Sequence, residues 1–266
     1  MKDNRIRNYV IWSYAVFWAM VLGICGTASM VFHCTPVVMR ILSNVCAWAP
    51  TIVLLCGFKY FCPNQTVAGF YKKAFGAKIN LSSLIIASLI TLGATIVTVF
   101  IVSIIQGNAF ASYWDLGVYP FWISFLFSIT TGPTGEESGW RGYLRILLNE
   151  KYSFFKSCVL QGVIWAFWHT VLWFVDSDYM GWQMIPYVMS NVVVMVGLCF
   201  LINNFMRKND NLVYGIIIHF CFNFLYCFLK VDILFYIILS VIYFIIIGII
   251  CAKINLNRTK KVKEYV

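Results

Sequence analysis

Charged side chains are scarce in this sequence, because Asp, Glu, Lys and Arg together make up 11% of its 266 residues. Soluble domains carry about 25% charged residues and disordered chains are also highly charged, so this scarcity excludes both classes. Hydrophobic residues make up 61% of the chain, and the mean hydropathy is +0.82. Because about 20 apolar residues cross a bilayer, the composition predicts an all-α polytopic membrane protein with about eight transmembrane helices.

The sequence also lacks any pair of cysteines in C-x-x-C spacing, although it contains 10 cysteines. A thiolate metal site or a redox motif is therefore not expected. The net charge of +10 comes from 20 basic and 10 acidic residues. The basic residues form short clusters between apolar runs rather than one patch, so we expect the lipid bilayer as a partner and no nucleic acid.

Eight apolar runs predict the membrane spans. The first is too long for the hydrophobic region of a signal peptide, so it is expected to remain as a helix. The fourth is short and leads through Gly132 and Pro133 into a polar, helix-like segment at 134–150. The runs lie near 9–32, 41–61, 81–105, 119–132, 153–175, 183–206, 212–229 and 231–252.

The distribution of basic residues predicts the orientation. If both termini are cytoplasmic, 18 of the 20 Lys and Arg residues lie in or beside the inner segments, which leaves Arg40 and Lys230 outside. This is the asymmetry of the positive-inside rule. We therefore expect a multi-pass protein of the cell membrane with both termini in the cytoplasm.

Four polar residues lie within or beside the apolar runs, where an unpaired polar group is costly. His169 and His219 are two of only three histidines in the chain, and Asn223 follows His219 by one helical turn. Taken singly, an intramembrane His or Asn is more often a hydrogen-bond partner between helices than a catalyst. Glu136 is a carboxylate at the end of the fourth run.

The presence of Glu137, the residue after Glu136, has a simpler structural explanation. Glu137 and Arg141 are spaced i,i+4, which predicts a supporting ion pair on one helix face. Consecutive helical residues point about 100° apart, so Glu136 cannot share Arg141 equally well. Glu136 is therefore expected to face a different environment.

If Glu136, His169, His219 and Asn223 surround one water-containing pocket, peptide hydrolysis becomes plausible. Glu136 and His169 would polarise a water and take its proton, while His219 and Asn223 would hold the oxyanion. No Ser or Cys is paired with a base, which disfavours a covalent intermediate. A catalytic zinc held by Glu136, His169 and His219 is the alternative, although no H-E-x-x-H run is present, and the sequence leaves both open.

Three short motifs follow one another within 119–229, and in this order they resemble the signature motifs of the CPBP family of intramembrane proteases. This family includes the type II CAAX prenyl endopeptidases and bacterial homologues linked to bacteriocin immunity and peptide processing. The motifs are Glu136-Glu137-x-x-x-Arg141, Trp165-x-x-x-His169 and His219-x-x-x-Asn223.

The resemblance implies an eight-helix bundle around a polar, conical cavity open to the cytosol, which agrees with the count of apolar runs. It implies that Glu136 and His169 activate the water and that His219 and Asn223 form the oxyanion site. The expected organisation is three N-terminal helices at 1–118, a catalytic core at 119–229, and a last helix with a basic tail at 230–266.

By the same resemblance, Glu137 and Arg141 position the helix of the first motif. Trp165 departs from the family, which usually has Phe at this position, so a larger ring is expected to wall and narrow the pocket. Members are labelled metalloproteases, but a metal-free glutamate mechanism is also argued for them, so Zn²⁺ remains an open cofactor.

The expected function is hydrolysis of a membrane-associated or lipidated peptide or protein near the cytosolic membrane face. A non-enzymatic membrane protein, which confers bacteriocin immunity or regulates a sensor kinase, is the alternative from another class. A transporter is a weaker alternative, because the sequence shows neither an inverted repeat nor paired broken helices.

Overall fold

The computed structural model describes residues 2–115, 119–175 and 179–263. Within these residues the backbone is helical apart from turns and one isolated bridge between Trp114 and Leu229. The predicted all-α class is therefore confirmed.

The helices are interrupted by short 3-10 and π-helical segments, which are labelled η. In chain order the elements are α1 (Lys2–Met20), η1 (Val21–Cys25), α2 (Gly26–Met30), α3 (Pro36–Cys46), α4 (Ala49–Cys56), α5 (Phe58–Phe61), α6 (Val67–Gly76), α7 (Leu81–Gln106), η2 (Phe110–Tyr113), α8 (Phe121–Thr130), α9 (Pro133–Glu137), η3 (Ser138–Leu144), α10 (Arg145–Lys151), α11 (Phe154–Trp168), α12 (Thr170–Val175), η4 (Gly181–Gln183), α13 (Met184–Met206), α14 (Val213–Tyr226) and α15 (Ile233–Lys263).

Six helical stretches of the described chain are long and apolar enough to cross a membrane, which makes this a polytopic membrane protein. Of the eight predicted spans, six are thus supported by length, whereas α8 has 10 residues and α14 has 14. At about 1.5 Å per residue, neither helix alone crosses a hydrocarbon core of about 30 Å. The six stretches are Asn4–Met30, Pro36–Cys56, Leu81–Gln106, Phe154–Val175, Gly181–Met206 and Ile233–Leu256.

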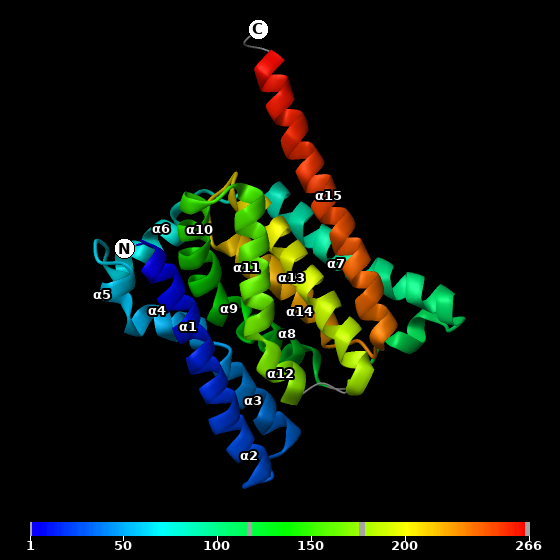
Figure 1. The fold of residues 1–266 in the computed structure, drawn as a ribbon. Helices are drawn as coiled ribbons and strands as arrows, with labels where there is room; N and C mark the ends of the chain where they lie inside the picture. The colour runs from blue at the N-terminus through cyan, green and yellow to red at the C-terminus, as the bar shows by residue number, and fades with distance from the viewer. Residues whose placement is uncertain (1, 116–118, 176–178, 264–266) are drawn as a thin grey trace.

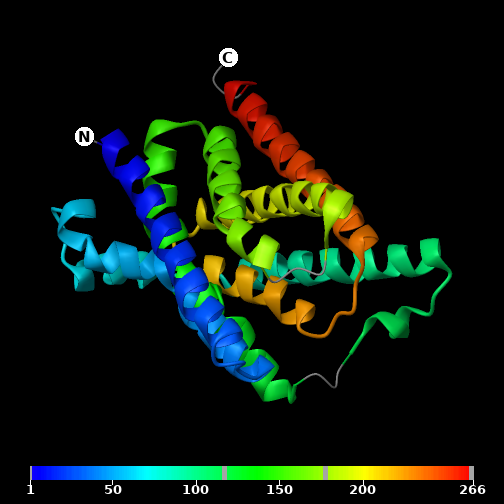
Figure 2. The same ribbon diagram turned by 60° about the horizontal axis from the view of Figure 1, so that its bottom comes forward.

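The helices form a bundle in which α1 and α15 lie on opposite sides and α11, α13 and α14 lie between them (Figures 1 and 2). The backbones of α11 and α13 approach closely at Gly162, where a Cβ atom would lie 2.4 Å from the Cα of Val196. Large apolar side chains such as Trp12, Leu89 and Phe244 remain exposed on the outer helices. Outward apolar faces of this kind are suited to lipid.

The segment from α9 through η3 to α10 crosses the interior of this bundle (Figure 1). Every residue of η3 is buried, including Arg141. π-Helical turns are rare and occur frequently at functional sites. This segment carries the first of the three motifs into the protein core.

Candidate active site

A tight turn at Thr131 and Gly132 joins α8 to α9. Gly132 has a φ of +94°, and the carbonyl of Gly132 accepts a hydrogen bond of 2.6 Å from the backbone N–H of Glu136. A Cβ atom at Gly132 would lie 2.8 Å from Glu136 Oε1 and 3.0 Å from His219 Nε2. A glycine is therefore required here for both conformation and space, and the two side-chain atoms face one common point beside the turn.

Glu136 is buried and is held by two indole groups. The Nε1–H groups of Trp165 and Trp140 donate to Glu136 Oε2 at 2.6 Å and 3.1 Å. Hydrogen bonds to a carboxylate are stronger than those between neutral groups. They fix the orientation of the side chain and leave Oε1 on the side that faces His219.

Glu137 lies on the other side of the same helix and holds two basic groups. Its Oε1 atom is 3.1 Å from Arg141 Nη1 and 2.8 Å from His219 Nδ1, and the Glu137 and Arg141 side chains are fully buried. The predicted ion pair between Glu137 and Arg141 is therefore confirmed. Because a carboxylate accepts hydrogen bonds, the proton of this contact lies on His219 Nδ1, and Nε2 is the atom directed toward Glu136.

His169 lies at the break between α11 and α12 rather than inside one continuous helix. Its Nδ1 atom is 2.9 Å from the carbonyl oxygen of Trp165, so this nitrogen donates and Nε2 remains available. The ring packs edge-on against Trp168 with centroids 4.7 Å apart. It also interacts electrostatically with Glu136 and His219.

Asn223 lies one turn after His219 on α14, and its side chain holds the turn between α8 and α9. The Nδ2 group donates to the carbonyl oxygen of Thr131 at 2.9 Å. One amide hydrogen is therefore used by the backbone, and the second remains for another acceptor. This anchoring contact is additional to the role that the sequence assigned to Asn223.

Trp165 connects the polar residues of the site. Its ring contacts that of His219 with centroids 5.0 Å apart and that of His169 at 6.0 Å. The Arg141 guanidinium lies 4.0 Å from the Trp165 ring centroid. The expectation that Trp165 only walls the pocket was incomplete, because its indole N–H also binds Glu136.

Sequence analysis missed two further contributors, Trp140 and Gly132. Trp140 follows Glu136 by four residues, so the helical i,i+4 spacing was the available signal. The Gly132-Pro133 pair marks the turn, but no sequence pattern shows that the glycine faces His219. That contact depends on the packing of α14 against α9.

The zinc alternative needs Glu136, His169 and His219 to converge as ligands on one ion. Within residues 2–115, 119–175 and 179–263, no group of three or more His, Cys, Asp or Glu side chains is arranged to hold a metal ion. The hydrogen bonds at Glu136 Oε2 and at the Nδ1 atom of each histidine are compatible with metal binding, because a histidine that binds a metal through Nε2 usually donates its Nδ1–H to a protein group. Zinc therefore stays an alternative to water activated by Glu136 and His169.

Two comparisons with known proteins agree with the motifs. A family model described as "Type II CAAX prenyl endopeptidase Rce1-like" matches residues 117–225. A protein named CAAX prenyl protease 2, from Methanococcus maripaludis, is 29% identical over an alignment of 174 residues that covers 60% of this chain and 62% of that protein. This match thus spans less than two thirds of the relative's length. Together the matches confirm the resemblance that the three motifs carry.

Proposed function

We propose that this chain, whose residues 117–225 carry the Rce1-like sequence, is an intramembrane endopeptidase that hydrolyses a peptide bond of a membrane-associated or lipidated substrate. The observation that supports this most directly is the common point faced by Glu136 Oε1 and His219 Nε2 beside Gly132. An acid–base group and a hydrogen-bond donor on one buried point are what hydrolysis by an activated water requires.

In this mechanism a water molecule binds between Glu136 Oε1 and His169 Nε2. Glu136 accepts the proton of the water as the oxygen attacks the peptide carbonyl, and then gives that proton to the leaving amine. The indole groups of Trp140 and Trp165 keep Oε2 occupied, so Oε1 is the atom that transfers the proton.

His219 and Asn223 accommodate the negative charge that develops on the carbonyl oxygen. His219 Nδ1 donates to Glu137, which orients the ring so that Nε2 faces the reacting carbonyl. Asn223 contributes the amide hydrogen that Thr131 does not use. Glu137 and Arg141 therefore act as positioning residues for His219.

An apolar groove beside the site supports a lipidated substrate. It lies between α3–α4 and α8, has a volume of about 850 Å³, and is lined by Ile41, Ile52 and Leu126 among others. Its lining also includes Trp48 and Thr130. Thr130 directly precedes the turn at Thr131 and Gly132. A hydrocarbon chain in this groove would place the attached peptide beside Glu136.

We also propose that the protein is oriented with both termini in the cytoplasm. The N-terminal end of α1 and the C-terminal end of α15 lie toward the same side of the bundle in both views (Figures 1 and 2), which supports an even number of membrane crossings. The asymmetry of basic residues assigns that side to the cytoplasm. Cleavage would then occur near the cytoplasmic face of the cell membrane.

The test is cleavage of a library of lipidated and unmodified membrane peptides by the purified protein in detergent, with and without a strong chelator. We expect cleavage in both conditions, because in the proposed mechanism Glu136 and His169, rather than a metal ion, activate the water. The His169→Ala variant should lose nearly all turnover. Equal turnover of the wild type and His169→Ala would contradict the proposal.

A further inference from the structure

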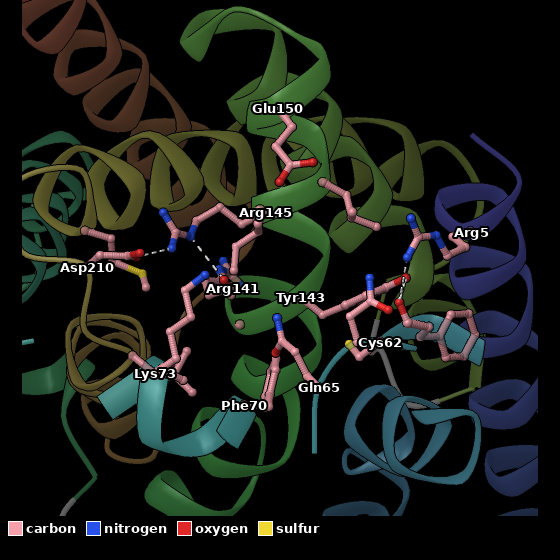
Figure 3. A pocket seen from close by; sticks show the side chains of 18 of the residues that line it. Arg5, Cys62, Gln65, Phe70, Lys73, Arg141, Tyr143, Arg145, Glu150 and Asp210 are labelled. Carbon is pink, nitrogen blue, oxygen red and sulfur yellow. Dashed lines mark hydrogen bonds and ion pairs between the residues drawn. The ribbon is translucent and has the colours of Figure 1, made fainter. Parts of the chain in front are cut away.

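A polar cavity lies on the far side of the segment that carries the first motif. It has a volume of about 210 Å³ and is formed by α6, η3, α10, the start of α1 and residues 61–65 and 206–212 (Figure 3). Most of these segments lie outside the six candidate membrane spans. We call this cavity the basic pocket. It lies at the polar end of the bundle.

Four cationic side chains line the basic pocket, namely Arg5, Lys73, Arg141 and Arg145, and Arg141 is paired with Glu137. Arg5 Nη1 donates to the carbonyl of Phe61 at 3.1 Å. Arg145 is buried, with Nε donating to the carbonyl of Arg141 at 3.1 Å and a second nitrogen bound to Asp210. The three arginines are thus held in place by contacts within the protein.

Lys73 differs from the three arginines. Figure 3 shows its side chain extending from α6 toward Arg145, into the space that the other residues surround. In the described part of the chain, no hydrogen bond or ion pair is formed by its ammonium group. Its neighbour Lys72 is equally exposed on the same helix but does not line the pocket. One cation is therefore directed into the pocket without a protein counter-ion.

The acidic residues of the basic pocket do not cancel this charge. Asp210 is paired with Arg145, and Glu150 lies at the outer end of α10. Burial raises the pKa of the Cys62 thiol, against the opposing effect of Arg5, and it also raises the pKa of the Tyr143 phenol. Neither group therefore supplies negative charge near neutral pH, and the inner part of the pocket is cationic.

We propose that the basic pocket binds a phosphate group, with Lys73 as its direct ion-pair partner and Arg145 as a second, pre-positioned donor. Arginine and lysine side chains converging on one cavity are suited to phosphate oxygens. A phospholipid headgroup is the source that the position favours, because basic pockets between helices at the membrane surface bind such groups. Apolar walls that include Phe61, Phe70 and Met206 would accommodate the glycerol and upper acyl carbons.

This inference does not depend on peptidase activity, because no catalytic residue is used. Binding is measured on the full-length protein, purified in an uncharged detergent, with short-chain phosphatidylglycerol, short-chain phosphatidylcholine or inorganic phosphate. The readouts are the dissociation constant and the rise in Tm. The Lys73→Gln variant is compared with Lys72→Gln, which loses the same charge on the same helix outside the pocket.

We expect phosphatidylglycerol to bind more tightly than phosphatidylcholine and to raise Tm. Lys73→Gln should weaken this binding by about fivefold, whereas Lys72→Gln should leave it unchanged. If inorganic phosphate raises Tm as much, with the same dependence on Lys73, the pocket is a phosphate site whose occupant is the free ion. Equal binding by the wild type, Lys73→Gln and Lys72→Gln would overturn the proposal.

Discussion

The two sides of the α9–η3 segment present adjacent carboxylates to different surroundings. Glu137 contacts two basic groups, Arg141 and His219, and has no exposed surface. Glu136 contacts two neutral indoles, and one of its oxygens faces the turn at Gly132. An ion pair keeps a buried carboxylate charged and fixed, whereas neutral donors orient it and leave its second oxygen available for proton transfer.

This difference predicts a structural role for Glu137 and a catalytic role for Glu136, although the two residues are adjacent. Glu137 should matter first for stability, because it compensates buried positive charge. Glu136 should matter first for turnover, because the indole groups that bind it are neutral and are not left with an unpaired charge when it is replaced. The following substitutions test that distinction, in order of decreasing expected effect.

The largest effect is expected for Glu137→Gln, which leaves Arg141 buried without a counter-ion. Breaking a buried ion pair in this way costs about 3–5 kcal/mol. Thermal and chemical unfolding of the purified protein measure the loss, and Glu150→Gln, an exposed carboxylate on α10, is the control with an expected change within about 0.5 kcal/mol.

Substitution of Arg141, the ion-pair partner of Glu137, tests whether the unpaired charge causes this loss of stability. In a double-mutant cycle, Arg141→Met should partly offset Glu137→Gln, because the unpaired charge is then absent. Strictly additive losses of stability would show that the ion pair does not explain the burial of these groups.

Glu136→Gln keeps the shape of the side chain but removes the group that accepts a proton. The hydrolysis rate should fall about a hundredfold or more, which corresponds to roughly 2.7 kcal/mol or more in the activation barrier. Unfolding should change by only about 1 kcal/mol, because the indole groups lose no opposite charge. A stability loss as large as that of Glu137→Gln would remove the distinction between the two residues.

Gly132→Ala tests the close approach of the turn to both active groups. The Cβ atom would contact Glu136 and His219, so we expect about a tenfold lower rate from their displacement. Gly107→Ala is the matched control, since Gly107 also has a positive φ of 67° but nothing within 4 Å of an added Cβ. Both variants lose about 1 kcal/mol through backbone strain, and only Gly132→Ala should lose turnover.

The smallest effect is expected for Trp165→Phe, which keeps an aromatic ring and removes one hydrogen bond to Glu136. A loss of about 1 kcal/mol of positioning corresponds to a rate about fivefold lower. Trp168→Phe is the control on the same helix, because its indole donates instead to the carbonyl of Ser13 at 3.0 Å. Equal rates for the two variants would exclude a positioning role for Trp165.

Local spacing predicted part of this architecture. The i,i+4 rule was sufficient for the ion pair between Glu137 and Arg141, and hydropathy was sufficient for six long apolar helices. The apolar runs at 119–132 and 212–229 contain shorter helices than the runs themselves, because hydropathy does not show where a turn ends a helix. At the first of these, α8 ends at Thr130 because Thr131 is extended, and Gly132, with its positive φ, completes the turn into α9.

Contacts between distant segments could not be predicted in the same way. The bond from Trp165 to Glu136 and the contact of His219 with Glu137 depend on how α11 and α14 pack against α9. The three motifs indicated that these residues belong together. They did not indicate which oxygen of Glu136 is bound and which one is available.

The most direct measurement is an experimental structure of the protein with a bound peptide phosphinate, which imitates the tetrahedral intermediate. We predict one phosphinate oxygen within hydrogen-bond distance of Glu136 Oε1 and His169, and the other within reach of His219 Nε2 and the Asn223 amide. A phosphinate centred away from Gly132, with Glu136 or His219 turned toward other partners, would contradict the proposed catalytic arrangement.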